Sequence, residues 1–489
     1  MALGLLLAGP LMAADSTKVD TAKAAKVDTS KKDTAAAVVA PAAPAPAVAD
    51  PNGSKTGDAS TIAAAKPGAP TLPEVAAALG HSIVGSNFVW TLFGGFLVMF
   101  MQAGFALVET GFCRAKNAAH TMFMNFAVYF LGMTGFFICG YALMMGNAYD
   151  VGAMTMFLFQ MVFMDTAVTI PTGAMAERWK TSNFVVFAFF MSMLVYPIYG
   201  NWVWGNGWLA KLGTNFGLGH GHVDYAGSSV VHMVGGVAAL AGAIVLGPRL
   251  GKYTKEGKPL AIPGHHIPMA ILGTMILAFG WFGFNAGSSL AANDLRISVI
   301  AVNTMLASAS GGIASMIYMY ILTKKFDPTM VVNGFLAGMV AITAPCAFVN
   351  PVSAFLIGAV AGVLVILAAF FVERTLKVDD PVGAIAVHGV NGAWGVLSLG
   401  LFADGTYGDG WNGVPGTVKG LFYGDASQFA AQLIGTATNV VWVFGMFFVF
   451  FKITDKIWGI RVSQEVEIEG LDIPECGVEG YNDFRISKS

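Results

Sequence analysis

The feature that most constrains this chain is a series of uninterrupted apolar runs, each about 20 residues long. An α-helix rises about 1.5 Å per residue, so such a run crosses the roughly 30 Å hydrocarbon layer of a bilayer. Only 11% of the 489 residues are charged and 55% are hydrophobic, whereas soluble domains carry roughly a quarter charged residues. The sequence therefore predicts an all-α polytopic membrane protein.

Eleven runs bounded by glycine, proline or charged residues are predicted to be transmembrane helices. The first ten fall into two groups of five, 84–247 and 267–402, and the membrane domain as a whole covers 84–451. The predicted spans are 84–109, 121–145, 151–174, 183–204, 224–247, 267–290, 297–322, 329–347, 352–372, 381–402 and 428–451.

The first 80 residues differ in composition from the rest of the chain. Residues 1–14 have an apolar stretch and a small-residue end, which predicts a signal peptide; the usual basic start is missing, as in a truncated one. Residues 15–80 are rich in Ala, Lys, Asp, Thr and Pro and cannot bury enough apolar surface to offset the entropy of ordering. We expect them to form a disordered, low-complexity extracytoplasmic segment.

Basic residues are distributed unevenly between the loops. Because cytoplasmic loops retain lysine and arginine, the loop set that holds twelve of them is predicted to be cytoplasmic. This places the N-terminus of the mature chain outside and the C-terminal tail, 452–489, in the cytoplasm. The opposite loops hold Lys211, Arg296 and Lys419, whereas the basic set holds Arg114, Lys116, Arg178, Lys180, Arg249, Lys252, Lys255, Lys258, Lys324, Lys325, Arg374 and Lys377.

Two spans share a pair of polar residues at the same spacing. DYAGSSVVHMVGG places Asp224 eight residues before His232, and DPVGAIAVHGVNG places Asp380 eight residues before His388. Each half has five spans, an odd number, so the second half must enter the membrane from the opposite face. We therefore predict a five-plus-five inverted repeat followed by a C-terminal helix, with the substrate path between the halves.

His232 and His388 are the histidines that lie well inside the predicted spans. An ionisable residue at such depth is a functional-site candidate, because its polar atoms must find partners in hydrocarbon. Under the repeat symmetry the two rings could meet at the membrane midplane; alternatively, each hydrogen-bonds a neighbouring helix. Zinc needs three or four ligands and no further ligand is evident, so no metal site is predicted.

The aspartates have simpler interpretations. Asp224 and Asp380 lie roughly 12 Å along the helix from their histidines, where a carboxylate caps a helix N-terminus. Asp224 also lies on the predicted outer face, where a carboxylate favours an arriving cation. Asp165, in the third span, is about 200° around the helix from Phe163, so we expect it to be a partnered carboxylate in a helix interface.

Aromatic residues near outer helix ends are suited to a small cation. GWFGFNAGS, residues 280–288, combines rings, an amide and a hydroxyl, and ring faces attract cations. Trp204 lies near the outer end of the fourth span, where it would equally fit the interfacial belt of aromatic residues.

Other function classes find little support in the sequence. The net charge is -2 and no Lys/Arg cluster is interleaved with aromatic residues, so no nucleic-acid partner is predicted. The four cysteines are widely spaced and form no CxxC pair. No Ser-His-Asp, Cys-His or metal cluster is evident, so we predict neither enzymatic activity nor a cofactor.

Several motifs in order resemble the ammonium transporters, a family grouped with the yeast methylammonium permeases and the Rhesus proteins. The resemblance covers residues 84–485 and points to the bacterial Amt-type branch. It rests on ETGFCRAKN (109–117), GAMAERWK (173–180), DYAGSSVVH (224–232), GWFGFNAGS (280–288), VDDPVGAIAVHGVNG (378–392) and RVSQEVEIEGLD (461–472).

The resemblance implies a homotrimer in the bacterial inner membrane, with a narrow pore in each subunit. Ammonium would be recruited at an outer aromatic site and deprotonated, and ammonia would pass a gate and two histidines with co-transfer of the proton. The implied residues are Trp204, Phe163, Ser288 and Asp224 for recruitment, Phe163 and Phe284 for the gate, and His232 and His388 for the pore and proton relay.

The resemblance also implies partners and leaves alternatives open. Methylammonium is a further expected substrate, and a PII-type regulatory protein is the expected partner of the cytoplasmic tail. The tail departs from the family's pattern, because residues 474–479 read PECGVE where the family often has His-Gly-Glu. The alternatives are an ammonium sensor that acts through this tail and a transporter of another small cation.

Overall fold

The computed structural model describes residues 65–66, 68–146 and 150–481. The predicted signal peptide, 1–14, and most of the segment 15–80 lie outside these residues. Within the described ranges every extended regular element is a helix, and β-bridges occur only as isolated pairs. The prediction of an all-α fold is confirmed.

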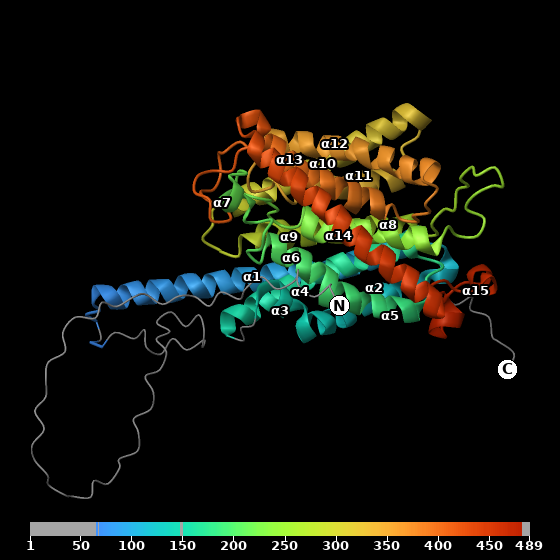
Figure 1. Ribbon diagram of the computed structural model, residues 1–489, viewed down its shortest axis with the longest axis horizontal. Coiled ribbons are helices and arrows are strands. Elements are labelled where there is room, and N and C mark those ends of the chain that lie inside the picture. Colours follow the sequence, from blue (N-terminus) through green and yellow to red (C-terminus); the bar gives the residue numbers. More distant parts are fainter. Residues whose placement is uncertain (1–64, 67, 147–149, 482–489) are drawn as a thin grey trace, which may run out of the picture. The chain divides into compact units, whose positions relative to one another are not determined.

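The α-helices account for most of the described chain (Figure 1). They are Leu72–Phe112 (α1), Ala118–Gly135 (α2), Tyr141–Met145 (α3), Val151–Met175 (α4), Thr181–Phe190 (α5), Tyr196–Val203 (α6), Leu212–Phe216 (α7), Val234–Leu246 (α8), Ile267–Asn285 (α9), Ile297–Thr323 (α10), Pro328–Ile342 (α11), Pro351–Phe370 (α12), Asn391–Phe402 (α13), Ala426–Trp458 (α14) and Gln464–Glu469 (α15).

Shorter helical segments extend or connect these helices. The π-helical segments are Phe136–Gly140 (η3), Met191–Val195 (η4), Ser228–Met233 (η5), Phe371–Thr375 (η7), Ile385–Val390 (η8) and Asp472–Cys476 (η10). The 3-10 segments are Ala115–Asn117 (η2), Ala286–Ser289 (η6) and Leu421–Tyr423 (η9).

Ten helical stretches of the described chain are long and apolar enough to cross a membrane. The eighth predicted span, 329–347, corresponds to the shorter apolar helix α11, which is followed by turns. The chain is therefore a multi-pass membrane protein, and the count of eleven spans stays a prediction.

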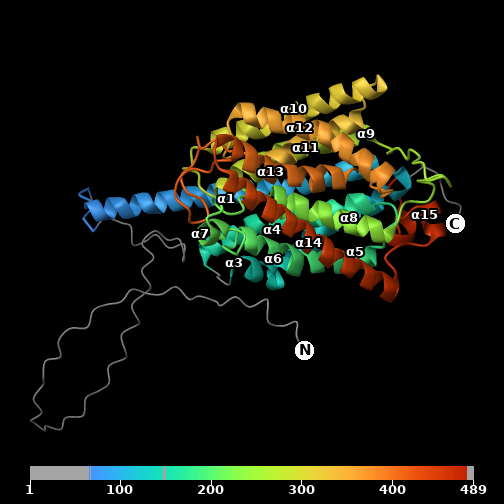
Figure 2. The same cartoon turned by 45° about the horizontal axis from the view of Figure 1, so that its top comes forward.

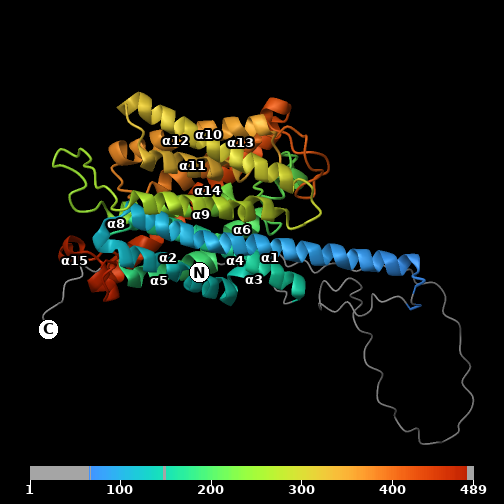
Figure 3. The same ribbon diagram turned by 180° about the vertical axis from the view of Figure 1, so that it is seen from behind.

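Two predicted boundaries are wrong. Helix α1 begins at Leu72, so residues 72–80 are helical rather than disordered. The start of the helix is fixed by a cap formed by Thr71 and Glu74. The Thr71 backbone N–H and hydroxyl both donate to Glu74 Oε2, at 2.7 and 2.9 Å. Helix α14 continues past the predicted end at 451 to Trp458, where Gly459 with φ of 74° ends it. In Figures 1 and 3 the first turns of α1 extend beyond the neighbouring helices.

The first helices of the two predicted repeats, α1 and α9, lie side by side (Figure 3). Small residues allow their backbones to approach closely. A Cβ at Gly104 would lie 2.9 Å from the Gly273 carbonyl, and one at Gly283 would lie 2.5 Å from the Gly94 carbonyl. Helix α8 lies between α4 and α14, next to α14 in Figure 2. The site described below lies among these helices.

The loops gather at opposite ends of the bundle (Figures 1 and 2). One end, here called the Trp204 end, carries α7 and the loops before η5 and α14. The other, the Arg249 end, carries α15 and the loops after α1, α4 and α8.

Candidate functional site

The rings nearest the Trp204 end form the first part of the site. Phe163 of α4 lies edge-on to Trp204 with ring centroids 6.2 Å apart, and it stacks on Phe284 of α9 at 4.2 Å. The Ser288 hydroxyl donates to the Phe284 carbonyl at 2.7 Å. Phe163 and Phe284 are buried, whereas Trp204 and Ser288 are half-buried. Two stacked rings therefore close the interior beneath a partly exposed indole.

The Asp224 side chain is buried and serves the start of its own helix. Its two carboxylate oxygens accept the backbone N–H groups of residues 227–230, and Oδ2 also accepts the Ser229 hydroxyl at 2.6 Å. This geometry fits the predicted capping role. The Asp224 carbonyl accepts the indole N–H of Trp204 at 2.7 Å. Asp224 thus orients the indole through its backbone carbonyl, while its carboxylate is hydrogen-bonded by the N–H groups and the hydroxyl at the start of its own helix.

The two histidines of the predicted pore touch each other. Their Nδ1 atoms are 3.2 Å apart, and their ring centroids are 5.3 Å apart with an interplanar angle of 25°. When two ring nitrogens form a hydrogen bond, one must donate and the other accept. His232 is fully buried, and its Nε2 has no hydrogen-bond partner in the described part of the chain. That atom is available to a small ligand.

Aromatic rings flank the histidine pair. Phe284 and Trp281 stack on His232 with centroids 5.2 and 5.1 Å away, and Phe105 lies 6.0 Å from His388. A ring column therefore leads from Trp204 through the stacked phenylalanines and the histidines to Phe105. Among the described residues no three His, Cys, Asp or Glu side chains gather as a metal site requires. The surroundings suit a small molecule that combines apolar contacts with one or two hydrogen bonds.

Backbone geometry explains why the histidines meet. Each lies in a π-helical segment, His232 in η5 and His388 in η8, and such segments shift side chains out of the α-helical register. Beside them, Gly236 and Gly389 cross so closely that a Cβ at Gly236 would lie 2.1 Å from the Gly389 nitrogen. Only glycine permits this approach. The equivalent positions of the two halves therefore meet, as the sequence repeat led us to expect.

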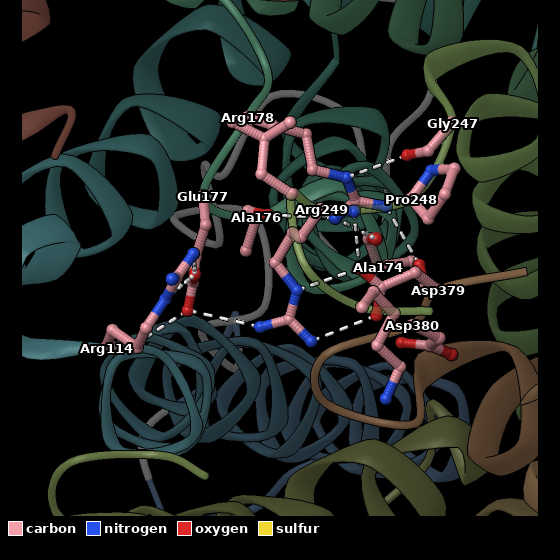
Figure 4. Close-up of polar contacts among 12 residues, drawn as sticks. Arg114, Ala174, Ala176, Glu177, Arg178, Gly247, Pro248, Arg249, Asp379 and Asp380 are labelled. Carbon is pink, nitrogen blue, oxygen red and sulfur yellow. Dashed lines mark hydrogen bonds and ion pairs between the residues drawn. The ribbon is translucent and has the colours of Figure 1, made fainter. Parts of the chain in front are cut away.

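A buried charge cluster lies at the Arg249 end (Figure 4). Arg249 donates to Asp379 through Nε at 2.8 Å and Nη2 at 3.0 Å, and its Nη1 lies 3.3 Å from Glu177. Arg114 pairs with the other Glu177 oxygen. Although burial opposes it, the Arg178 and Arg249 guanidiniums hold the pKa of Asp379 below its usual value. The cluster fastens loops from both halves of the chain to one another.

Two further carboxylates lie apart from the ring column. Asp380 accepts the backbone N–H groups of Gly383 and Ile385 at 3.0 and 2.7 Å, in keeping with capping. Asp165 is buried beside Gly132 of α2, and its Oδ1 has no hydrogen-bond partner among the described residues. The prediction of a partnered carboxylate is wrong for this oxygen, because it faces Gly132, which has no side chain to donate a hydrogen bond.

Glu109 is a candidate that the sequence pattern did not single out. It lies near the end of α1, is only 3% exposed and, with His388, lines a small cavity. Its signal in the sequence is a carboxylate within an apolar run, but that signal does not say which side of the helix meets the pore.

The chain matches the model of the Ammonium Transporter Family over residues 89–481. It is similar to ammonium transporter Amt2 of Archaeoglobus fulgidus, with 48% identity over 81% of this chain and 88% of that protein. Ammonium transporter Amt1 of Haloferax mediterranei is 37% identical over 82% of this chain and 80% of its own length.

Solved structures are similar as well. One entitled Sensor Amt Protein has a TM-score of 0.74 and 37% identity, and the match covers 81% of this chain and 99% of that one. Candida albicans Mep2 has a TM-score of 0.68 and 28% identity over 78% of this chain and 87% of that one.

Proposed function

Because this chain belongs to the ammonium transporter family, we propose that it moves ammonium across the bacterial inner membrane along the ring column. The observation that carries the proposal is the buried His232–His388 pair beneath the stacked rings of Phe163 and Phe284. The loop charges support an orientation with the Trp204 end and N-terminus outside and the Arg249 end and C-terminal tail in the cytoplasm.

Recruitment begins at Trp204. A cation over an indole face is attracted by roughly 0.5–1 kcal/mol when exposed and by more when partly desolvated. The Ser288 hydroxyl donates its hydrogen to the Phe284 carbonyl, so its oxygen is free to accept an ammonium N–H. Asp224 supports the site by holding the indole through the hydrogen bond to its carbonyl.

The stacked pair Phe163 and Phe284 selects against ions that keep their charge. A bare cation in an apolar constriction loses several kcal/mol or more of hydration that the rings do not replace. Ammonium differs from potassium and sodium because it can release a proton and continue as neutral ammonia. We propose that the two rings open transiently to admit ammonia. The ammonia then meets Nε2 of His232, which has no hydrogen-bond partner among the described residues.

The histidine pair provides both donors and acceptors in an otherwise apolar path. The shared Nδ1 contact lets a proton pass from one ring to the other while each ring changes tautomer. The proton that ammonium releases can therefore cross through the histidine pair while ammonia crosses through the pore. Transport in this form carries one positive charge per ammonia.

The assembly and partners are also part of the proposal. We propose a homotrimer with one pore in each subunit, which native mass spectrometry in detergent would detect. Methylammonium is a second substrate. A PII-type regulatory protein would bind the cytoplasmic face, where the C-terminal tail lies against the loops at the Arg249 end.

Two other functions fit the site less well. A transporter of another small cation needs oxygen ligands to replace water along the path, whereas the ring column supplies rings and imidazoles. A sensor would relay binding through its tail, and one similar structure is entitled a sensor. The curated relatives are named transporters, which favours transport.

The test is an ammonium concentration jump on proteoliposomes adsorbed to a solid-supported membrane. We expect a transient inward current with ammonium and a smaller one with methylammonium. Equal jumps of potassium or sodium should give no more current than protein-free vesicles. Potassium currents as large as the ammonium current would contradict the proposal.

A further inference from the structure

Glu109 is buried where the ring column ends, and the route proposed above gives it no role. Its oxygens lie among polar groups of α2 and α4: the Asn125 amide donates to Oε2 at 2.8 Å, and the Thr172 hydroxyl oxygen lies 2.8 Å from Oε2 and 3.1 Å from Oε1. Arg114 and Arg249 of the charge cluster at the Arg249 end pair with Glu177 and Asp379, not with Glu109. Glu109 is thus a carboxyl group without an ionic partner among the described residues.

The hydrogen bonds of Thr172 indicate that the Glu109 carboxyl group is neutral. The Thr172 hydroxyl has one hydrogen, and its shortest contact is with the Thr169 carbonyl, at 2.5 Å. A carbonyl can only accept, so the hydrogen of Thr172 is directed there. The remaining contact between Thr172 and Glu109, at 2.8 Å, then needs a hydrogen from Glu109. The Asn125 amide is held in place by Thr121 and Thr169, so it remains a donor to Glu109.

The carboxyl group borders a space of molecular size. A cavity of about 20 Å³ is lined by Glu109, His388 and Phe105, among others. One water-sized molecule needs roughly 10–15 Å³ by this measure, so the cavity has room for one water or one ammonia. Asn333 and Val382 line this cavity and also a larger one, of about 530 Å³, that is open toward the Arg249 end. The small cavity therefore lies between the histidine pair and the larger cavity, which we call the vestibule.

We propose that Glu109 is a proton-carrying residue of the pore that returns a proton to ammonia on the cytoplasmic side of the histidines. This inference rests on the proposed function and deepens it. Ammonia in the small cavity takes the proton of the Glu109 carboxyl group: the O–H bond breaks, an N–H bond forms, and ammonium leaves through the vestibule. The carboxylate that remains accepts a proton from His388, so an N–H bond of His388 breaks and the O–H bond of Glu109 is restored. The histidine pair is then reprotonated by the proton that the next ammonium releases on the outer side, where an ammonium N–H bond breaks and an imidazole N–H bond forms. One ammonia and one proton cross in each cycle.

The structure offers a matched pair of variants. Glutamine at position 109 keeps a carbonyl acceptor and offers N–H donors in place of the O–H group of the neutral carboxyl, but it has no acidic proton to transfer. Glu109→Gln should therefore fold and leave the cavity open. Asp165 is equally buried, at 3% exposure, and lies outside the ring column. Asp165→Asn is the control for the loss of a buried carboxyl group in a membrane helix.

Two readouts on the same proteoliposomes separate charge transport from ammonia passage: the current after an ammonium jump and the alkalinisation of the lumen reported by a pH dye. In Glu109→Gln we expect the current to fall by at least tenfold. This is a cautious threshold, because loss of a group that transfers a proton in an enzyme usually slows the reaction by about 100-fold or more. The lumen should still become alkaline faster than that of protein-free vesicles. Glu109→Asp should recover part of the current, and Asp165→Asn should keep it.

Other results would overturn the inference. An unchanged current in Glu109→Gln would show that the proton takes another route. Loss of both current and alkalinisation in Glu109→Gln, not recovered in Glu109→Asp, would assign Glu109 a structural role. If the wild-type protein alkalinised the lumen without a current, proton transfer through Glu109 would be excluded, whereas ammonia conduction would stand. A wild type without any ammonium response would instead contradict the proposed function itself.

Discussion

At the scale of single residues, hydrogen positions decide much of the chemistry. His222, at the Trp204 end, is a clear case. The Ser229 hydroxyl donates to Asp224 at 2.6 Å, so it accepts from His222 Nε2 at 3.0 Å, and the ring must carry its hydrogen on Nε2. His222 Nδ1 has no partner in the described part of the chain. A second proton there would place a positive charge in a buried position.

The state of His222 predicts how stability depends on pH. Burial lowers the pKa of His222 to about 4, although the Asp224 carboxylate opposes this shift. The unfolded chain, with a pKa near 6.5, then binds more protons than the folded one between the two values. The contribution of neutral His222 to the free energy of unfolding is therefore complete above about pH 6.5. On acidification it falls by up to roughly 1.4 kcal/mol per pH unit.

Thermal unfolding in detergent at pH 7 and pH 5 measures this effect. Wild-type protein should lose more stability over that interval than His222→Gln, which keeps a donor for Ser229 and cannot titrate. If both proteins respond equally to pH, His222 does not titrate as described.

At the scale of helices, close crossings at glycine hold the two repeats together. Gly236→Ala would place a methyl group 2.1 Å from the Gly389 backbone nitrogen, so the helices must separate and the contact between His232 and His388 must lengthen. We expect the ammonium current to fall severalfold and the melting temperature to decrease. Gly445→Ala is the control, because a Cβ at Gly445 of α14 would have nothing within 4 Å. A wild-type current in Gly236→Ala would contradict this account of how the histidines are positioned.

The helical elements also show what a sequence can predict. Span positions followed from apolar runs, because a lipid environment leaves few other solutions. The start of α1 was missed since its cap, Thr71 with Glu74, lies within a segment whose composition indicated disorder. The π-helical segments around His232 and His388 leave no mark in the apolar pattern, yet they shape the site.

The candidate site was predictable to a similar extent. The equal spacing of Asp224–His232 and Asp380–His388 predicted that two rings could meet, and the family resemblance supplied Phe163 and Phe284. Which face of α1 turns toward the pore depends on its packing against α4 and α9, so Glu109 could not be recognised from its position in the chain.

At the scale of the whole molecule, the C-terminal tail is bound to the membrane domain. Glu467 of α15 is buried; it accepts from Arg461 at 2.8 Å and from the Leu250 backbone N–H at 2.6 Å. The Lys116 ammonium donates to the Glu467 carbonyl at 2.6 Å. The tail therefore joins loops from different parts of the chain at the Arg249 end.

Removing the charge of Glu467 should loosen this attachment selectively. A buried hydrogen bond to a charged group contributes about 1.5–3 kcal/mol, so Glu467→Gln should speed amide hydrogen exchange in residues 461–472 and at Leu250 by about tenfold or more. Exchange in α8 and α13 should not change. Glu469→Gln, at an exposed position of the same helix, is the control. Equal protection in both variants would mean that Glu467 does not hold the tail.

The central claim is that ammonium crosses by way of the histidine pair. The most direct test compares wild-type protein with His232→Ala and His388→Ala in proteoliposomes, recording the current after an ammonium jump beside a potassium jump. The account predicts an ammonium-specific current in the wild type that is lost in both variants. Full ammonium currents in both variants would contradict it.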